Sequence, residues 1–397
     1  MPFLLYLLAV AVFAQGTSEF VLAGLIPGIS ADLGVSIAHA GLLTSGFAVG
    51  MVVGAPLMAA LGRRLPPRWT LSSFLVLFIA MHAIGAVTDH FGVLFASRVV
   101  SAFANAGFLA VALSTVTAVV PAHSRGRALA VILSGTTLSL IAGVPVGALI
   151  GDVWGWRSAL WAIAGLSTAA LVAVVLLAPR RLGATDPQAA PRLHAELRTL
   201  RSRNLRTNLG LAVLVNGATF CAFTFLTPIV TREAGMDSSL IPFLLALFGV
   251  GAFIGVSTAG RLADKQSRRV IAVTTPALLA GWALWTVVAN DPLLPWVLSF
   301  LQGALSFALG STLIARSMAA AAGAPTMSGS FATVALNLGA MCGPVLGGYA
   351  IGAVGLTGPL MVSAALVLVA AALWGAMILH RRLSTMNPEA SVDARID

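Results

Sequence analysis

The sequence predicts an all-α integral membrane protein whose twelve transmembrane helices form two pseudo-symmetric six-helix halves. Of its 397 residues, 58% are hydrophobic and only 9% are charged, whereas soluble domains contain about 25% charged residues. Apolar stretches of about 20 residues, long enough to cross the hydrocarbon core of a bilayer, recur along the whole chain. Similar residues also recur at a spacing of 200 or 201 positions, which indicates an internal repeat.

The apolar stretches define the expected spans, and each should be helical because open sheet edges are not satisfied in lipid. The first stretch lacks a basic N-terminal region and continues past Glu19 to Pro27. We therefore interpret it as a retained span and not as a cleaved signal peptide. The expected spans are residues 3–26, 41–61, 70–88, 91–118, 127–151, 156–178, 207–230, 240–261, 270–289, 292–315, 326–352 and 355–379.

The basic residues predict the orientation. A net charge of +10 would suggest a nucleic-acid partner for a soluble protein, but the distribution of charge argues against this. If residue 1 is cytoplasmic, the inward loops and tails hold 20 of the 23 Lys and Arg residues, the outward loops hold Arg157 and Arg232, and Arg98 lies within a span. The positive-inside rule then places both termini in the cytoplasm and the protein in the cytoplasmic membrane, with the lipid bilayer as its partner.

The repeat divides the chain. Gly54, Leu61, Arg64 and Arg68 recur 201 residues later as Gly255, Leu262, Lys265 and Arg269. We predict an N-terminal half (1–179), a cytoplasmic linker with a basic amphipathic segment (180–206), a C-terminal half (207–380) and a cytoplasmic tail (381–397). Two parallel six-span halves are typical of transporters that bind substrate at the midplane between the halves.

Glu19 is the only acidic residue within the predicted spans. An ionisable side chain at that depth costs about 3 kcal/mol or more, and such residues are usually functional. Burial favours the neutral form of a carboxyl and a nearby cation favours the charged form, so Glu19 could gain and lose a proton as its surroundings change. The alternative is a permanently protonated carboxyl that is bonded to a neighbouring helix.

Arg98 is the only Lys or Arg in the interior of a predicted span, since the others lie in loops or within two residues of a span end, and it shares a helix face with Ser101 and Asn105. Its guanidinium must meet a carboxylate, backbone carbonyls or water. We expect Arg98 to lie near Glu19 in one conformation and to leave it in another, so that the two residues couple transport to protons. A fixed interhelical bond is the alternative role of Arg98.

Substrate contacts are expected where the halves face each other. At the offset of 201, Glu19 corresponds to Phe220, and Gln15 corresponds to Asn216. An apolar, aromatic wall with a few amides is typical of small-molecule sites, although ordinary packing could explain any one Phe. The expected substrate-binding residues are Gln15, Glu19, Asn105, Asn216, Phe220, Phe223, Gln302 and Asn337, and Thr227 shares the helix face of the two Phe residues.

Glycine and proline residues interrupt the fifth and eleventh expected spans. Gly143 and Gly147 in the fifth span recur 200 residues later as Gly343 and Gly347, and each pair has a proline close by, Pro145 and Pro344. Small residues permit close approach of backbones, and prolines kink helices, so these positions suit gating surfaces as well as static packing.

The remaining patterns are mainly negative. We interpret His82 in the third span as a satisfied packing residue. No metal-ligand cluster, nucleophile triad or phosphate-binding loop occurs at a recognisable spacing, so we expect no enzyme, no metal and no cofactor.

Several segments resemble the major facilitator superfamily, in particular its twelve-span drug/H+ antiporter branch. Residues 255–269, which read Gly-Val-Ser-Thr-Ala-Gly-Arg-Leu-Ala-Asp-Lys-Gln-Ser-Arg-Arg, are similar to the cytoplasmic loop signature of that branch. Arg98 stands where the branch keeps an arginine tied to proton coupling, and residues 143–147 resemble its fifth-span motif of exporters. The resemblance implies conformational roles for Asp264 and Arg268, whereas Arg63 stands where the first-half loop of the branch carries an acid.

Residues 13–27, 40–50 and 105–113 resemble the chloramphenicol exporters of actinobacteria. The resemblance implies drug export in exchange for protons, by a protein that functions as a monomer. Export of a sugar, a nucleoside or another small metabolite, or of a broader range of drugs, remains the alternative.

Overall fold

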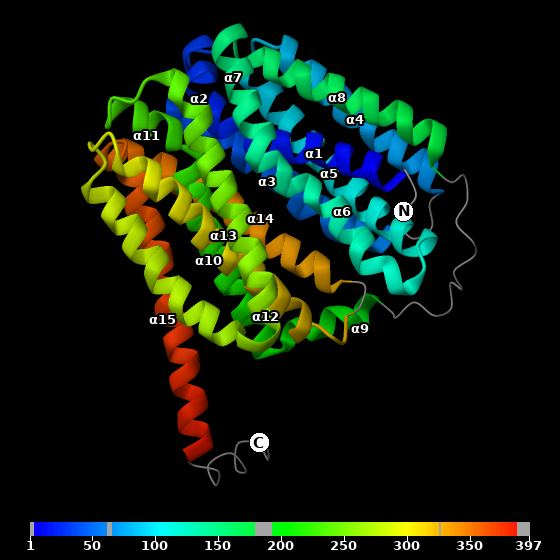
Figure 1. Cartoon of the computed structure of the whole chain (residues 1–397), viewed down its shortest axis with the longest axis vertical. Helices are drawn as coiled ribbons and strands as arrows, with labels where there is room; N and C mark the ends of the chain where they lie inside the picture. The colour runs from blue at the N-terminus through cyan, green and yellow to red at the C-terminus, as the bar shows by residue number, and fades with distance from the viewer. Residues whose placement is uncertain (1–3, 62–65, 179–192, 325–326, 387–397) are drawn as a thin grey trace.

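A computed structural model of the chain describes residues 4–61, 66–178, 193–324 and 327–386, and these ranges contain helices and no strands (Figure 1). The N-terminal part contains eight α-helices and a π-helical turn, Ser139–Gly143, that joins α6 to α7. These helices are α1 (Leu4–Phe20), α2 (Leu22–Asp32), α3 (Ile37–Leu61), α4 (Pro67–Val87), α5 (Phe91–Val119), α6 (Arg125–Leu138), α7 (Val144–Trp154) and α8 (Trp156–Leu177).

The second part begins with the short linker helix α9 (Leu193–Leu197). It continues with α10 (Arg203–Thr224), α11 (Leu226–Arg232), α12 (Ile241–Val287), α13 (Leu294–Ala320), α14 (Ser328–Val354) and α15 (Gly358–Met386). Figure 1 shows α15 projecting beyond the other helices at one end of the molecule.

Eleven segments of the described chain are long and apolar enough to cross a membrane, and the pair α1 and α2, bent by 51°, makes a twelfth. This confirms the predicted all-helical membrane fold. Helix α12 contains two successive spans that are separated at Gln266, where the backbone leaves helical geometry (φ −133°, ψ 25°). The first predicted span ended at residue 26, but α2 continues to Asp32 because Pro27 is accommodated inside the helix.

Close glycine contacts repeat between the halves. In α3, a Cβ on Gly50 would collide with the α5 backbone at Val99 and Phe103. In α12, a Cβ on Gly251 would collide with the α13 backbone at Phe300 and Ala304. Each residue of the second set lies 201 positions after its counterpart, so the repeat in the sequence is also a repeat in helix packing.

A second pair of contacts repeats in the same way. Gly143 lies against Thr17 of α1, and Gly343 lies against the α10 backbone at Gly217 and Cys221. The glycines of the fifth and eleventh spans therefore bring together two helices of the same half, as static packing requires.

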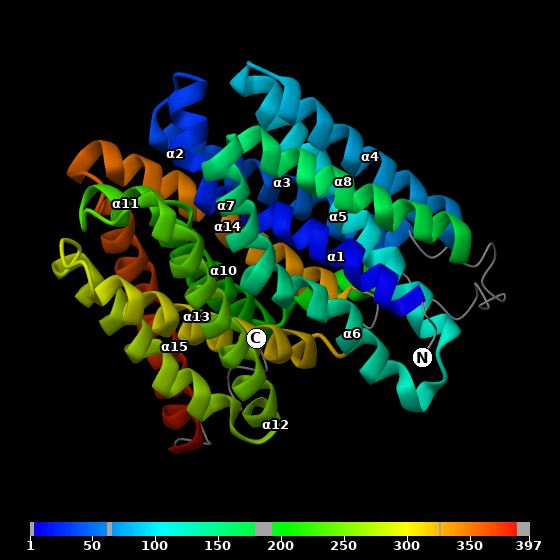
Figure 2. The same ribbon diagram turned by 45° about the horizontal axis from the view of Figure 1, so that its top comes forward.

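The two ends of the bundle differ. We call the end with residues 33–36, 88–90 and 233–237 the short-loop end, and the end with residues 120–124 and α9 the basic end. Figures 1 and 2 both show α2 beside α11 at the short-loop end.

One hydrophobic core is shared by the two halves, and near the short-loop end it includes Ile26, Ala148, Ile229 and Leu245. Towards the basic end each half has a core of its own. The N-terminal one includes Leu8, Phe108 and Ile132, and the C-terminal one includes Leu205, Ala321 and Met327. The halves are therefore joined at the short-loop end and packed separately at the basic end.

A proline creates the hydrogen bond that joins the halves. Pro27 has no N–H to donate to the carbonyl of Ala23 one turn earlier. That carbonyl instead accepts a hydrogen bond of 2.6 Å from the Thr227 hydroxyl of α11. Since both groups are buried, the bond satisfies a backbone oxygen that would otherwise be unpaired.

Contact at this seam should depend on Gly249, because a Cβ there would collide with the backbone at Leu140 and Ile141 of the other half. We predict that Gly249→Val forces the halves apart at the short-loop end without disturbing either half. In a background without native cysteines, maleimide should label a cysteine at Ala23, which is 2% exposed, several-fold faster in the Gly249→Val protein.

Gly310→Val is the control, because a Cβ at Gly310 would meet no atom within 4 Å. Equal labelling rates in the two valine variants would show that Gly249 does not hold the seam closed.

Candidate functional site

Arg98 lies on α5 in the middle of the N-terminal half and is 2% exposed. Its Nη1 donates to the Ser18 hydroxyl at 2.7 Å, and its Nη2 donates to the Ser18 carbonyl at 2.5 Å. Its guanidinium carbon also lies 4.6 Å from the centre of the Phe47 ring. Two charge-assisted hydrogen bonds and a cation–π contact thus offset the cost of burying this cation.

His82 of α4 completes this network. Its Nε2 lies 2.7 Å from the Ser18 Oγ, and its Nδ1 lies 2.8 Å from the Phe78 carbonyl. A carbonyl can only accept, so Nδ1 carries the ring proton and Nε2 is left as an acceptor when the ring is neutral. Ser18 therefore donates to His82 and accepts from Arg98, while the Arg98 Nε–H has no hydrogen-bond partner in the described chain.

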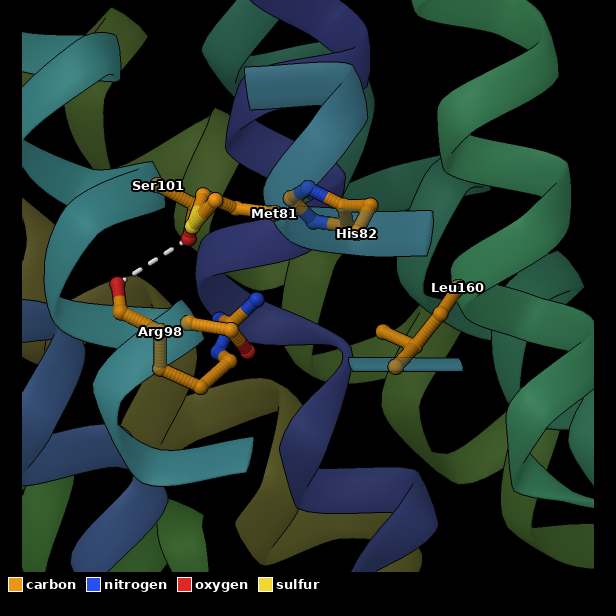
Figure 3. Close-up of a pocket in the computed structure, with 6 residues that line it drawn as sticks. Met81, His82, Arg98, Ser101 and Leu160 are labelled. Atoms are coloured by element: carbon orange, nitrogen blue, oxygen red, sulfur yellow. Dashed lines mark hydrogen bonds between the residues drawn. The ribbon is translucent and has the colours of Figure 1, made fainter. Parts of the chain in front are cut away.

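The network is dry. A narrow gap beside it is lined by Met81, His82, Ser97, Arg98, Ser101 and Leu160, and it is too small to admit a water molecule. Figure 3 shows Arg98 and His82 near the same stretch of α1, with the Ser101 hydroxyl bonded to the Arg98 carbonyl at 3.0 Å. With water excluded, hydrogen bonds and charge interactions here are stronger than at a surface.

Glu19 follows Ser18 on α1 and is only partly buried. Within the described chain, neither a hydrogen bond nor a salt bridge joins its carboxylate to another residue. Glu19 and Arg98 are nevertheless close enough for their opposite charges to attract each other. In this conformation Arg98 binds the residue before the acid and not the acid itself.

An aromatic cluster lies where α1 meets the other half. Phe20 stacks on Phe220 with a centroid distance of 5.7 Å, and its edge meets Phe223 at 6.5 Å. Phe223 packs against Phe248 at 4.5 Å, which in turn contacts Phe307 at 6.2 Å. The cluster places two rings of α10 against Phe20, the residue that follows Glu19, and continues from there to α12 and α13.

The predicted amides lie in different surroundings. Gln15 is 1% exposed, and both polar atoms of its side chain lack a partner in the described chain. Asn105 contacts the Met51 sulfur at 3.6 Å, and Asn216 donates to the Leu336 carbonyl at 2.7 Å. Gln15 is thus the amide with the most unused bonding capacity, which is expensive unless another group binds there.

Two other predicted residues are bonded within their own half. Gln302 is fully buried and donates to the Leu278 carbonyl of α12 at 3.2 Å. Asn337 donates to the Thr333 carbonyl of its own helix at 3.0 Å. Thr227, expected on the aromatic wall, instead makes the bond that joins α11 to α2.

Of the predicted conformational residues near the basic end, only Arg268 has a described side chain. The side chain of Asp264 and the whole of Arg63 lie outside the described residues, and Arg268 is exposed. Pro145 lies in the first turn of α7, and Pro344 lies inside α14. The described residues contain no group of three His, Cys, Asp or Glu side chains that could hold a metal ion.

A second cavity of about 350 Å³ lies at the short-loop end between α2, α7, α11 and α12. Its wall includes Pro27, Asp152, Trp156 and Thr231. Because the bond between Thr227 and Ala23 lies beside it, this cavity is on the joined side of the bundle.

Comparison with known proteins agrees with this architecture. The family model of the Major Facilitator Superfamily matches residues 8–335 and 209–394. The chain is 53% identical over 371 residues to a chloramphenicol resistance protein of Streptomyces lividans, covering 93% of this chain and 95% of the relative. It is 31% identical over 346 residues to the inner membrane transport protein YdhP of Escherichia coli K12, covering 87% and 88%.

Solved structures share the fold at low identity. The nucleoside transporter NupG matches with a TM-score of 0.75 and 14% identity, covering 95% of this chain and 98% of that one. A bacterial homologue of the human lysosomal transporter Spinster, crystallised in an inward-facing and unoccupied conformation, matches with a TM-score of 0.73 and 17% identity, covering 94% and 95%.

Proposed function

The chain belongs to the Major Facilitator Superfamily, and we propose that it exports a small drug, chloramphenicol, across the cytoplasmic membrane in exchange for protons. The observation that carries this proposal is the pair of Glu19 and Arg98 in the membrane interior, directly beside an aromatic cluster between the halves. The similarity to a chloramphenicol resistance protein over 93% of the chain supports the choice of substrate.

The positive-inside rule places the basic end and both termini in the cytoplasm. The core that is continuous at the short-loop end and divided at the basic end supports a state that is closed to the outside. Export then requires the seam between α2 and α11 to open while the halves close at the basic end.

Glu19 is the proposed proton carrier. In a closed, apolar site its carboxyl is neutral, and when Arg98 approaches it the carboxylate is favoured. The halves move between these arrangements, so the proton is taken up from the outside and released on the cytoplasmic side. Drug and proton compete for the same conformations, which couples their opposite movements.

Chloramphenicol is neutral and contains an aromatic ring, hydroxyls and an amide. It therefore needs apolar contact and a few hydrogen bonds, but no counter-ion. Phe20, Phe220 and Phe223 offer aromatic surface, and Gln15 offers an unused donor and acceptor. A sugar or nucleoside would need more hydrogen-bonding groups than this wall supplies, which favours the drug over these alternatives.

We further propose that the monomer transports without a cofactor, since both halves of the site come from one chain.

Glu19→Gln should abolish proton-driven export but preserve the fold, because glutamine resembles a protonated glutamic acid in shape and bonding. In a sensitive host, the wild-type protein should raise the inhibitory chloramphenicol concentration about tenfold or more, and the variant should return it to the level of the empty vector. Glu233→Gln, which changes a loop carboxyl at the short-loop end, is the control. Full resistance from the Glu19 variant at equal expression would exclude Glu19 as the proton carrier.

Arg98→Ala should impair export and change its pH dependence, because the cation that favours the Glu19 carboxylate is lost. Drug uptake into inverted vesicles, measured between pH 5 and 8, checks this expectation. Arg316→Ala is a suitable control, since Arg316 binds Asn208 and Ser267 and packs on Trp374 within the C-terminal half. An unchanged pH profile in the Arg98 variant would leave that residue with a structural role only.

Phe220→Ala should weaken chloramphenicol binding about tenfold, because an aromatic contact of this kind contributes about 1.4 kcal/mol. Proton uptake by Glu19 should change less. Phe243→Ala removes an equal area from a ring that is 63% exposed on α12, and it should leave drug affinity unchanged. Calorimetric titration of the purified proteins compares the two, and equal affinities would place the drug elsewhere.

A further inference from the structure

We propose that His82 is a positioning residue for proton coupling: through the Ser18 hydroxyl it holds Arg98 away from the Glu19 carboxylate and so sets the pH at which Glu19 releases its proton. This inference rests on the proposed role of Glu19 as the proton carrier. It adds a residue from a third helix, α4, to the two ionisable residues of α1 and α5.

The geometry assigns each member a direction. Arg98 Nη1 donates to the Ser18 Oγ at 2.7 Å, the hydroxyl donates to His82 Nε2 at 2.7 Å, and His82 Nδ1 donates to the Phe78 carbonyl at 2.8 Å. Because His82 accepts the hydroxyl proton, the lone pairs of Ser18 are turned toward Arg98. The imidazole thus orients the group that binds the guanidinium.

The orientation of the Ser18 hydroxyl matters because the three side chains are buried. Ser18 is fully buried, and Arg98 and His82 are each 2% exposed, so water cannot replace a missing acceptor. Arg98 therefore has two competing anchors one residue apart on α1, the Ser18 hydroxyl with its carbonyl and the Glu19 carboxylate. Whatever strengthens the first anchor reduces the time that Arg98 spends near the second.

Within the described chain, no other ionisable group enters this balance from the packed elements. Helix α6 and the π-helical turn present Thr136 and Ser139 to α1. Helix α1 contributes Glu19, α4 contributes His82 and α5 contributes Arg98, whereas α3 presents Phe47 and α8 presents Leu160 in the described part of the chain. From the other half, the ring of Phe220 stacks on Phe20, the residue that follows Glu19.

Removal of the acceptor should shift the balance toward Glu19. In His82→Phe the ring volume is kept but the Ser18 proton has no acceptor, so the hydroxyl turns and holds Arg98 less well. Arg98 then approaches Glu19 more often and stabilises its carboxylate. Glu19 should release its proton about one pH unit lower, which is the scale of one hydrogen bond to a charged group.

The test measures this titration directly on the purified full chain, without substrate. The carbonyl band of protonated carboxyls is followed by infrared spectroscopy against pH, and the same titration of each variant with Glu19→Gln is subtracted to isolate Glu19. We expect His82→Phe and Ser18→Ala to shift the midpoint to lower pH, and the double variant to shift it no further. His82→Gln should restore the wild-type midpoint, because its Oε1 can accept where Nε2 does.

An unshifted midpoint in both His82→Phe and Ser18→Ala, a shift to higher pH, or an equal shift in His82→Gln and His82→Phe would overturn the proposal. If His82→Phe does not fold, Ser18→Ala against wild type decides the question. Since no drug is present, failure of chloramphenicol export would not affect this titration. Normal export together with an unshifted midpoint would overturn only the role of His82.

Discussion

The burial of one guanidinium constrains the N-terminal half. A cation in a dry membrane interior must find its hydrogen-bond acceptors in the protein, and both Nη atoms of Arg98 find them in the hydroxyl and the carbonyl of Ser18. The hydroxyl in turn needs an acceptor for its own proton, which His82 supplies from α4. Helices α4 and α5 are thereby bonded to α1 at the level of Glu19, so the proposed proton carrier lies next to a cation whose position depends on Ser18 and His82.

The sequence predicted much of the fold, because its evidence is local or periodic. Span lengths, the scarcity of charge and the offset of 201 residues lead to the helical halves, and Gly50 and Gly251 show the same offset in their contacts. The break of the first span after Phe20 and its extension to Asp32 were not predicted. The sequence does not show that Thr227 of the other half bonds to the Ala23 carbonyl that Pro27 leaves unpaired.

The sequence singles out the ionisable residues of the candidate site, but it does not predict which residues they bond to. Depth alone singles out Glu19 and Arg98, but the partner of Arg98 depends on how α5 is placed beside α1. Ser18 and Glu19 are consecutive on α1, so a change of one residue in the alignment of the two helices would exchange the Ser18 hydroxyl for the Glu19 carboxylate as the partner of Arg98. For the same reason His82 was expected to be a packing residue: it is indeed satisfied, but its bond to Ser18 spans 64 residues of sequence and leaves no local pattern.

The two halves have the same helix packing, but the ionisable residues lie in the N-terminal half and aromatic residues take the equivalent depth in the C-terminal half. Phe47, which packs on Arg98, corresponds at the offset of 201 to Phe248 of the aromatic cluster. Arg98 itself corresponds to Ser299, whose hydroxyl bonds to the Leu244 carbonyl, and Glu19 corresponds to Phe220. Each ionisable residue in the bilayer costs about 3 kcal/mol or more, so a duplicate set would destabilise the protein without adding a function. Because movement of the halves can expose one set to both sides in turn, the second half is free to present aromatic surface at the same depth.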